Sequence, residues 1–109
     1  MDQSYQIIIT RTARAGMKEI LDYLIANTSV EAADKVRKGL NEAIRSLKTM
    51  PSRNGMEHDI SSEHLIYRRI LKWSYKIVYT IEEDTIRVIV VDISHTKQDP
   101  QSLIDKFKK

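Results

Sequence analysis

Residues 67–81 read YRRILKWSYKIVYTI, two apolar and aromatic runs separated by a short polar link. Runs rich in β-branched and aromatic residues are typical of β-strands. We therefore expect strands at residues 65–71 and 75–81, joined by a tight connection at 72–74. A third run at 86–94 follows the acidic turn 82–85, so the three strands are expected to form an antiparallel meander.

The upstream half of the chain changes from strand to helix periodicity. Apolar residues recur every three or four positions there, which predicts amphipathic helices. Thr10 or Thr12 is the expected N-cap of the first helix, and Thr28 with Glu31 fits a capping box for the second. The expected elements are a strand at 6–10, a helix at 12–26, a break at 27–29 and a second helix that ends before Pro51.

This order of elements, β-α-α-β-β-β, predicts an α+β fold. A helical hairpin is expected to pack on one face of an antiparallel sheet, which leaves the opposite face partly open. The even composition over residues 1–109 predicts a single domain, with an irregular loop at 51–62. Leu103, Ile104 and Phe107 have helical spacing, so a short C-terminal helix is expected to dock on the body.

Composition excludes several kinds of chemistry. The chain has no cysteine, so it has no disulfide, thiolate nucleophile or cysteine zinc site. Its three glycines are isolated, so there is no glycine-rich phosphate loop, and His58, His64 and His95 lack metal-ligand spacing. We expect no metal or cofactor. No apolar run approaches the roughly 20 residues of a membrane span, and no secretory signal is evident, so we expect a cytoplasmic protein without a membrane partner.

Positive charge gathers in the strand region. Residues 64–81 contain Arg68, Arg69, Lys72 and Lys76 and no acid, although the net charge of the chain is only +3. Such a strip would attract phosphate or an acidic partner segment, or it could simply be a sheet edge protected by charge. Neighbouring strand residues point to opposite faces, so only one arginine of the pair can lie on the face without helices, and we expect Arg69 there.

Several segments together resemble the RelE/ParE superfamily of bacterial toxins from type II toxin–antitoxin modules, also described as plasmid stabilisation proteins. The resemblance covers nearly the whole chain. Its carriers are residues 5–10 with Ala13, residues 20–24, Ala32-Ala33, Leu47, Met50-Pro51, Arg69, residues 75–79, residues 93–95 and Asp99-Pro100.

The resemblance implies a cognate antitoxin as partner and two alternative activities. One branch, RelE-like, implies a metal-free endoribonuclease that cleaves mRNA on the ribosome. Arg69 matches its strand arginine, and His95 would exchange protons near neutral pH. The further cations expected to bind phosphate or the antitoxin are Arg53, Arg68, Lys72 and Lys97.

The other branch, ParE-like, implies inhibition of DNA gyrase through binding alone. Thr96 follows His95 where some RelE-like nucleases have an aromatic residue that stacks on a base. The long helical hairpin with Ala32-Ala33 also resembles the ParE-like branch. These features favour the gyrase-binding alternative slightly, so the sequence leaves open whether the chain is an enzyme. A dimer or a toxin–antitoxin hetero-oligomer is the expected assembly.

Overall fold

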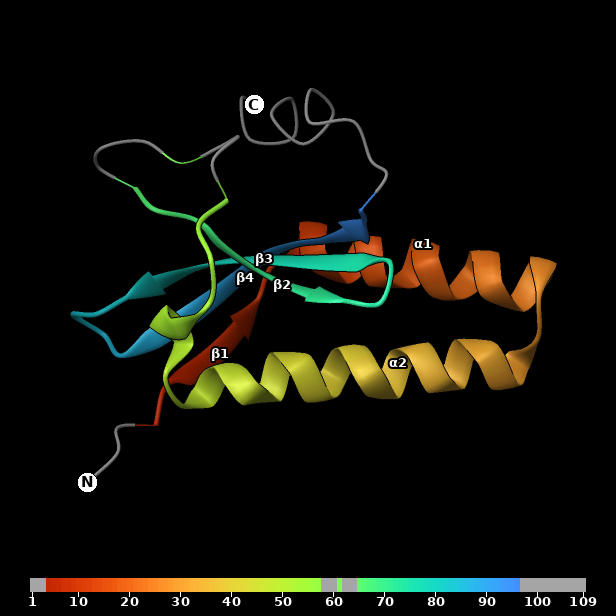
Figure 1. Cartoon of the computed structure of the whole chain (residues 1–109), viewed down its shortest axis with the longest axis horizontal. Helices are drawn as coiled ribbons and strands as arrows, with labels where there is room; N and C mark the ends of the chain where they lie inside the picture. Colours follow the sequence, from red (N-terminus) through yellow and green to blue (C-terminus); the bar gives the residue numbers. More distant parts are fainter. Residues whose placement is uncertain (1–3, 58–60, 62–64, 97–109) are drawn as a thin grey trace.

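The computed structural model describes residues 4–57, 61 and 65–96. Figure 1 shows a helical hairpin beside a sheet, beyond which the far end of the hairpin extends. The predicted order of elements and the α+β class are confirmed. The elements are β1 Gln6–Ile9, α1 Arg11–Asn27, α2 Val30–Arg45, the 3₁₀ turns η1 Ser46–Lys48 and η2 Pro51–Arg53, β2 Arg68–Lys72, β3 Tyr75–Glu82 and β4 Arg87–His95.

Short polar side chains start both helices. The Thr10 hydroxyl accepts a hydrogen bond from the Ala13 amide at 3.2 Å, which confirms one of the two predicted caps of α1. The prediction for α2 is wrong by one residue, because Ser29 rather than Thr28 is its N-cap. Thr28 instead ends α1, and its backbone N–H donates to the Leu24 carbonyl. Both residues can cap a helix, and the tight break between the helices decides between them.

The four strands form one sheet in the order β1-β4-β3-β2. The meander is confirmed, since β2 pairs antiparallel with β3 and β3 pairs antiparallel with β4. β1 pairs parallel with β4, so the sheet is mixed and not antiparallel throughout as expected. The helical hairpin is the crossover connection that lets β1 lie parallel to a later strand.

A bulge in β4 changes the side-chain alternation along that strand. Tyr79 pairs with Val90 and Val78 pairs with Asp92, so Val91 lies between the two partners. Beyond the bulge the alternation resumes with Ile93 on the helix side of the sheet. The extra residue thus allows apolar residues on both sides of the bulge to reach the same core.

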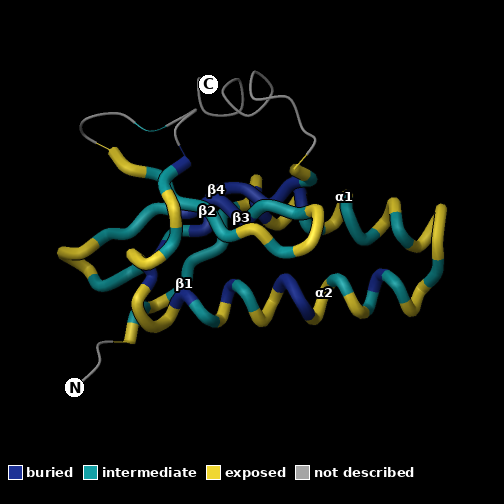
Figure 2. The backbone as a smooth tube through the Cα atoms, viewed as in Figure 1, coloured by how far each residue is buried: buried dark blue, intermediate teal, exposed yellow. Residues whose placement is uncertain are grey.

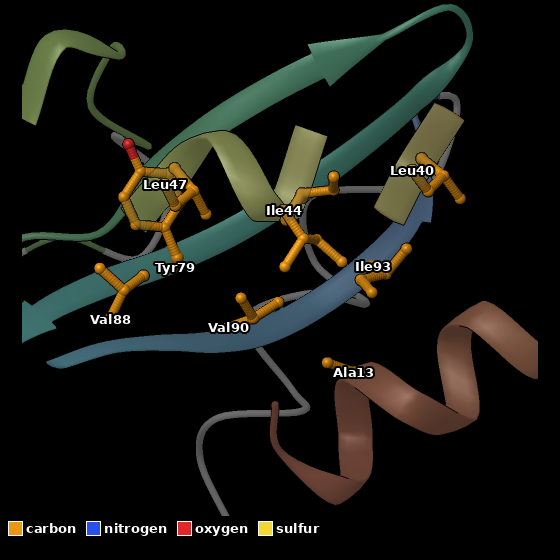
Figure 3. Close-up of a cluster of buried hydrophobic side chains, with 9 residues drawn as sticks. Ala13, Leu40, Ile44, Leu47, Tyr79, Val88, Val90 and Ile93 are labelled. Atoms are coloured by element: carbon orange, nitrogen blue, oxygen red, sulfur yellow. The ribbon is translucent and has the colours of Figure 1, made fainter. Parts of the chain in front are cut away.

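The core lies between the sheet and the hairpin (Figure 3). Both helices supply residues to it, which places them on the same face of the sheet. Figure 2 shows the buried residues along the inner sides of the elements and the exposed ones on the outer sides of the helices. The buried members of the cluster are Ala13, Leu40, Ile44, Leu47, Ile77, Tyr79, Val88, Val90 and Ile93.

α1 approaches β4 closely through a glycine. A Cβ added to Gly16 would lie 2.0 Å from the carbonyl oxygen of Ile93, so only glycine fits at this position. Glycine in a helix interior costs stability relative to alanine, and here it is required by the contact between the two elements.

Within the described residues, no helix is both long and apolar enough to span a bilayer. The C-terminal helix predicted from Leu103, Ile104 and Phe107 lies outside the described residues.

Candidate functional site

Strand alternation separates Arg68 from Arg69 as predicted. Arg68 pairs with Tyr79, whose side chain lies in the core on the helix side, whereas Arg69 pairs with Val78 on the opposite side. The Arg68 guanidinium donates to the Asn54 carbonyl at 2.7 Å. The two arginines therefore face different partners.

The face that bears Arg69 is less open than expected. Val78 and Asp92 on this side are fully buried, and Glu57 is 4% exposed. The expectation of a partly open face is therefore wrong at the centre of the sheet. Towards the edge strand, the Arg69 side chain remains 35% exposed.

Arg69 belongs to a small charged cluster on this face. Its guanidinium donates to the Met56 carbonyl and lies 4.0 Å from the Glu57 carboxylate. The same carboxylate forms an ion pair with the Lys76 ammonium at 2.6 Å. A largely buried carboxylate needs such cationic partners, because an unpaired buried charge is costly. Arg69 and Lys76 thus offset part of the cost of burying the Glu57 carboxylate.

His95 lies at the end of β4 on the helix side. It pairs with Tyr75, and the two rings make an edge-to-face contact with centroids 5.5 Å apart. Beside them is a pocket of about 400 Å³ between α1 and the sheet, with Gly16, Ile20 and Tyr23 in its wall. The imidazole therefore lies against the Tyr75 ring and beside a pocket whose wall also contains Glu19 and Ser94.

The sheet separates Arg69 from His95. Arg69 is on the face away from the helices and His95 is on the helix face, and β3 lies between their strands. Their register positions on β3, Val78 and Tyr75, are three residues apart, which adds roughly 10 Å along the strand. The structure therefore does not bring the two predicted catalytic residues together around one phosphate.

The other predicted cations are divided between the two ends of β2. Arg53 on η2 and Arg68 lie near the Tyr79 hydroxyl, and Lys72 lies at the far end of the strand. Burial raises the pKa of Tyr79, while the hydrogen bond from Asn54 and the positive charges of both arginines act in the opposite direction. Lys97 lies outside the described residues.

A second basic surface, not predicted from the sequence, lies between α2 and the β2–β3 turn. Its groove has a volume of about 650 Å³, and the Trp73 indole lies at one side of it. The sequence does contain a pattern that indicates a basic helix side, because cations of α2 recur there at three- and seven-residue spacing. The sequence alone does not show that these cations of α2 lie opposite the β2–β3 turn. The residues that line the groove are Lys35, Arg37, Lys38, Gly39, Asn41, Glu42, Arg45, Lys72 and Trp73.

No group of three or more histidine, aspartate or glutamate side chains with metal-binding proximity occurs in the described part of the chain. His58 and His64, considered above as metal ligands, lie outside it.

Comparison with solved structures supports the fold assignment. The "Chromosomal ParDE TA system from P. aeruginosa" superposes with a TM-score of 0.67 at 14% identity, covering 85% of this chain and 97% of the other. The toxin–antitoxin complex RelBE2 of Mycobacterium tuberculosis gives 0.55 at 18% identity, covering 84% and 91%. A free mutant of the E. coli toxin RelE gives 0.50 at 13% identity, covering 95% and 98%. At these identities the likeness shows the fold alone.

Comparison with sequence families identifies the family of the chain. No curated protein sequence matches the chain significantly. Residues 7–100 match the family described as "ParE toxin of type II toxin-antitoxin system, parDE". This match spans β1, the helical hairpin and the whole meander. The chain therefore belongs to the ParE toxin family of type II toxin–antitoxin systems.

Proposed function

We propose that this ParE-family toxin stops bacterial growth by binding DNA gyrase in the cytoplasm and that a cognate antitoxin holds it inactive. The main support for the proposal is that Arg69 and His95 lie on opposite faces of the sheet. Cleavage of RNA without a metal requires cations and a proton-transfer group around one phosphate. An inhibitor that acts through binding has no such requirement.

The exposed end of the helical hairpin also supports a protein target. Tyr23, Ile25 and Val30 are 66%, 51% and 64% exposed there. Tyr23 and Ile25 are two residues apart on α1 and border different pockets, so apolar side chains are accessible on more than one side of this end of the hairpin. This end of the hairpin extends beyond the sheet, where a large target can approach it (Figure 1).

An antitoxin partner is supported by the nature of the structural neighbours. The M. tuberculosis RelBE2 structure is described as a toxin–antitoxin complex, and the P. aeruginosa structure as a ParDE toxin–antitoxin system. We expect co-expression of the cognate antitoxin to restore growth to cells that produce the toxin.

Two assays on the purified chain distinguish gyrase inhibition from ribosome-dependent mRNA cleavage. The first measures supercoiling of relaxed plasmid by gyrase, and the second measures transcript integrity in a translating extract. We expect blocked supercoiling, intact transcripts and relief of the block by antitoxin. Cleaved transcripts with normal supercoiling would overturn the proposal.

Arg69→Ala and His95→Ala separate the two activities further. A nuclease that used these residues would lose activity in each variant. Gyrase inhibition is expected to persist in both, provided that circular dichroism shows them folded. Glu57→Gln serves as the matched control for Arg69→Ala, because it disturbs the same charged cluster without removing the arginine.

A further inference from the structure

The groove between α2 and the β2–β3 turn has an unusual excess of positive charge. Five of its lining residues are cationic, and Glu42 is the single carboxylate among them. Arg37 and Lys38 both pair with Asp34, with 3.1 Å between the Lys38 ammonium and that carboxylate. These bonds lower the pKa of Asp34. Arg37 and Lys38 thus share the one negative charge of Asp34.

The remaining three cations are Lys35, Arg45 and Lys72. None of them forms an ion pair with a carboxylate among residues 4–57, 61 and 65–96. They come from two elements that are distant in sequence, α2 and the end of β2. Concentrating like charges in one groove is unfavourable without a ligand, because the charges repel each other. An anionic ligand would remove that repulsion.

Trp73 organises this groove at a cost to local stability. Its φ angle is 53°, in the left-handed region that bulky residues rarely occupy, and its side chain lies against Gly39 in the interior of α2. A Cβ at position 39 would lie 2.3 Å from the indole, so the glycine makes room for the ring. The two-residue connection between β2 and β3 favours a positive φ at this position.

The indole also positions two of the three uncompensated cations. The Lys72 ammonium lies 4.7 Å from the ring centroid and the Lys35 ammonium 5.9 Å from it. Attraction between a cation and the face of an aromatic ring favours these positions of the two lysine side chains. The ring thus holds together ammonium groups from separate elements.

We propose that this groove binds the phosphate backbone of duplex DNA. The proposal rests on the proposed function, since gyrase presents duplex DNA to whatever binds it. Lys35 and Arg45 are ten residues apart on α2, which corresponds to roughly 15 Å. Phosphates of one DNA strand recur every ~3.4 Å along the duplex axis, so this length spans about four of them.

The lining favours DNA over an acidic protein segment. Amphipathic helices that dock in grooves use apolar anchors at regular spacing. Apart from Gly39 and Trp73, all residues that line this groove are polar or charged. The Trp73 indole is the single large apolar side chain in this lining. Contacts to phosphate carry no sequence information, and binding is expected to be independent of sequence.

Binding is measurable on the purified full chain without gyrase. Trp73 is the only tryptophan, so its fluorescence should change when a short duplex fills the groove. Three phosphate contacts predict a slope of about −2.7 for log affinity against log salt concentration. This corresponds to a loss of about 40-fold between about 50 and about 200 mM salt.

Two triple variants with the same loss of charge provide the test, read by anisotropy of a labelled duplex. The groove variant is Lys35→Gln, Arg45→Gln and Lys72→Gln, and the control variant, on exposed positions of α1, is Arg11→Gln, Arg14→Gln and Lys18→Gln. We expect the groove variant to lose the salt-dependent binding and the control to retain most of it. Equal losses in both variants would overturn the proposal, as would wild-type binding by the groove variant.

Other outcomes identify other ligands or separate this proposal from gyrase inhibition. Tighter binding of polyglutamate or RNA than of duplex DNA would also overturn it. If the chain binds DNA through the groove but does not inhibit supercoiling, the proposed function fails and the groove assignment stands. If supercoiling is inhibited equally by the wild type and a groove variant that still binds DNA, the groove assignment fails instead.

Discussion

Replacing Gly16 with alanine tests the close contact between α1 and β4. The new Cβ would lie 2.0 Å from the Ile93 carbonyl oxygen, and α1 would have to withdraw by about 1.4 Å to restore an ordinary contact of 3.4 Å. The obstacle is backbone in the middle of the sheet, so it cannot rotate away. Overpacking of this kind costs ~1–3 kcal/mol, and the higher helix propensity of alanine returns up to ~1 kcal/mol.

We expect Gly16→Ala to lower the free energy of unfolding by about 2 kcal/mol, or Tm by about 10 °C. Urea and thermal denaturation followed by circular dichroism measure the effect. Gly55→Ala is the matched control, because nothing lies within 4 Å of its added Cβ and its φ is not positive. Its stability should stay within ~0.5 kcal/mol of the wild type. A Gly16→Ala protein as stable as this control would refute the reasoning.

Two further predictions concern buried polar groups. The buried Tyr79 hydroxyl donates to the Pro51 carbonyl and accepts from the Asn54 amide at 3.0 Å, so Tyr79→Phe should cost ~1–3 kcal/mol in urea denaturation. Burial raises the pKa of Tyr79 in the folded state. The contribution of this hydroxyl to the free energy of unfolding is therefore complete below its unfolded pKa of ~10 and is lost as pH rises above that value. The wild type should lose stability in alkali more steeply than Tyr79→Phe, and parallel pH profiles would contradict this. The second prediction concerns the ion pair between Glu57 and Lys76, whose side chains are 5% and 17% exposed. A double-mutant cycle of Glu57→Gln and Lys76→Met should give a coupling energy of about 2 kcal/mol. Additive effects of the two substitutions would show that the pair contributes nothing to stability.

Local sequence patterns were sufficient for most of the fold. The change from strand to helix periodicity, a cap at Thr10 or Thr12 and the meander were all predicted from neighbouring residues, because these features depend on interactions over a few positions. The choice of Ser29 over Thr28 as the cap of α2 was not predicted, since both side chains are able to cap. The parallel pairing of β1 with β4 was missed too, because it depends on a contact between residues about 80 positions apart.

The division of Arg68 from Arg69 was determined by the sequence alone, because alternation along a strand is a local property of the backbone. Which of the predicted site residues share a surface was decided only by the tertiary structure. Strand order and register place His95 on the face opposite Arg69. The contact of Trp73 with Gly39 joins cations from two distant elements in one groove. Residues from distant elements meet on one surface because the elements pack together. The spacing of residues within each element does not predict that packing.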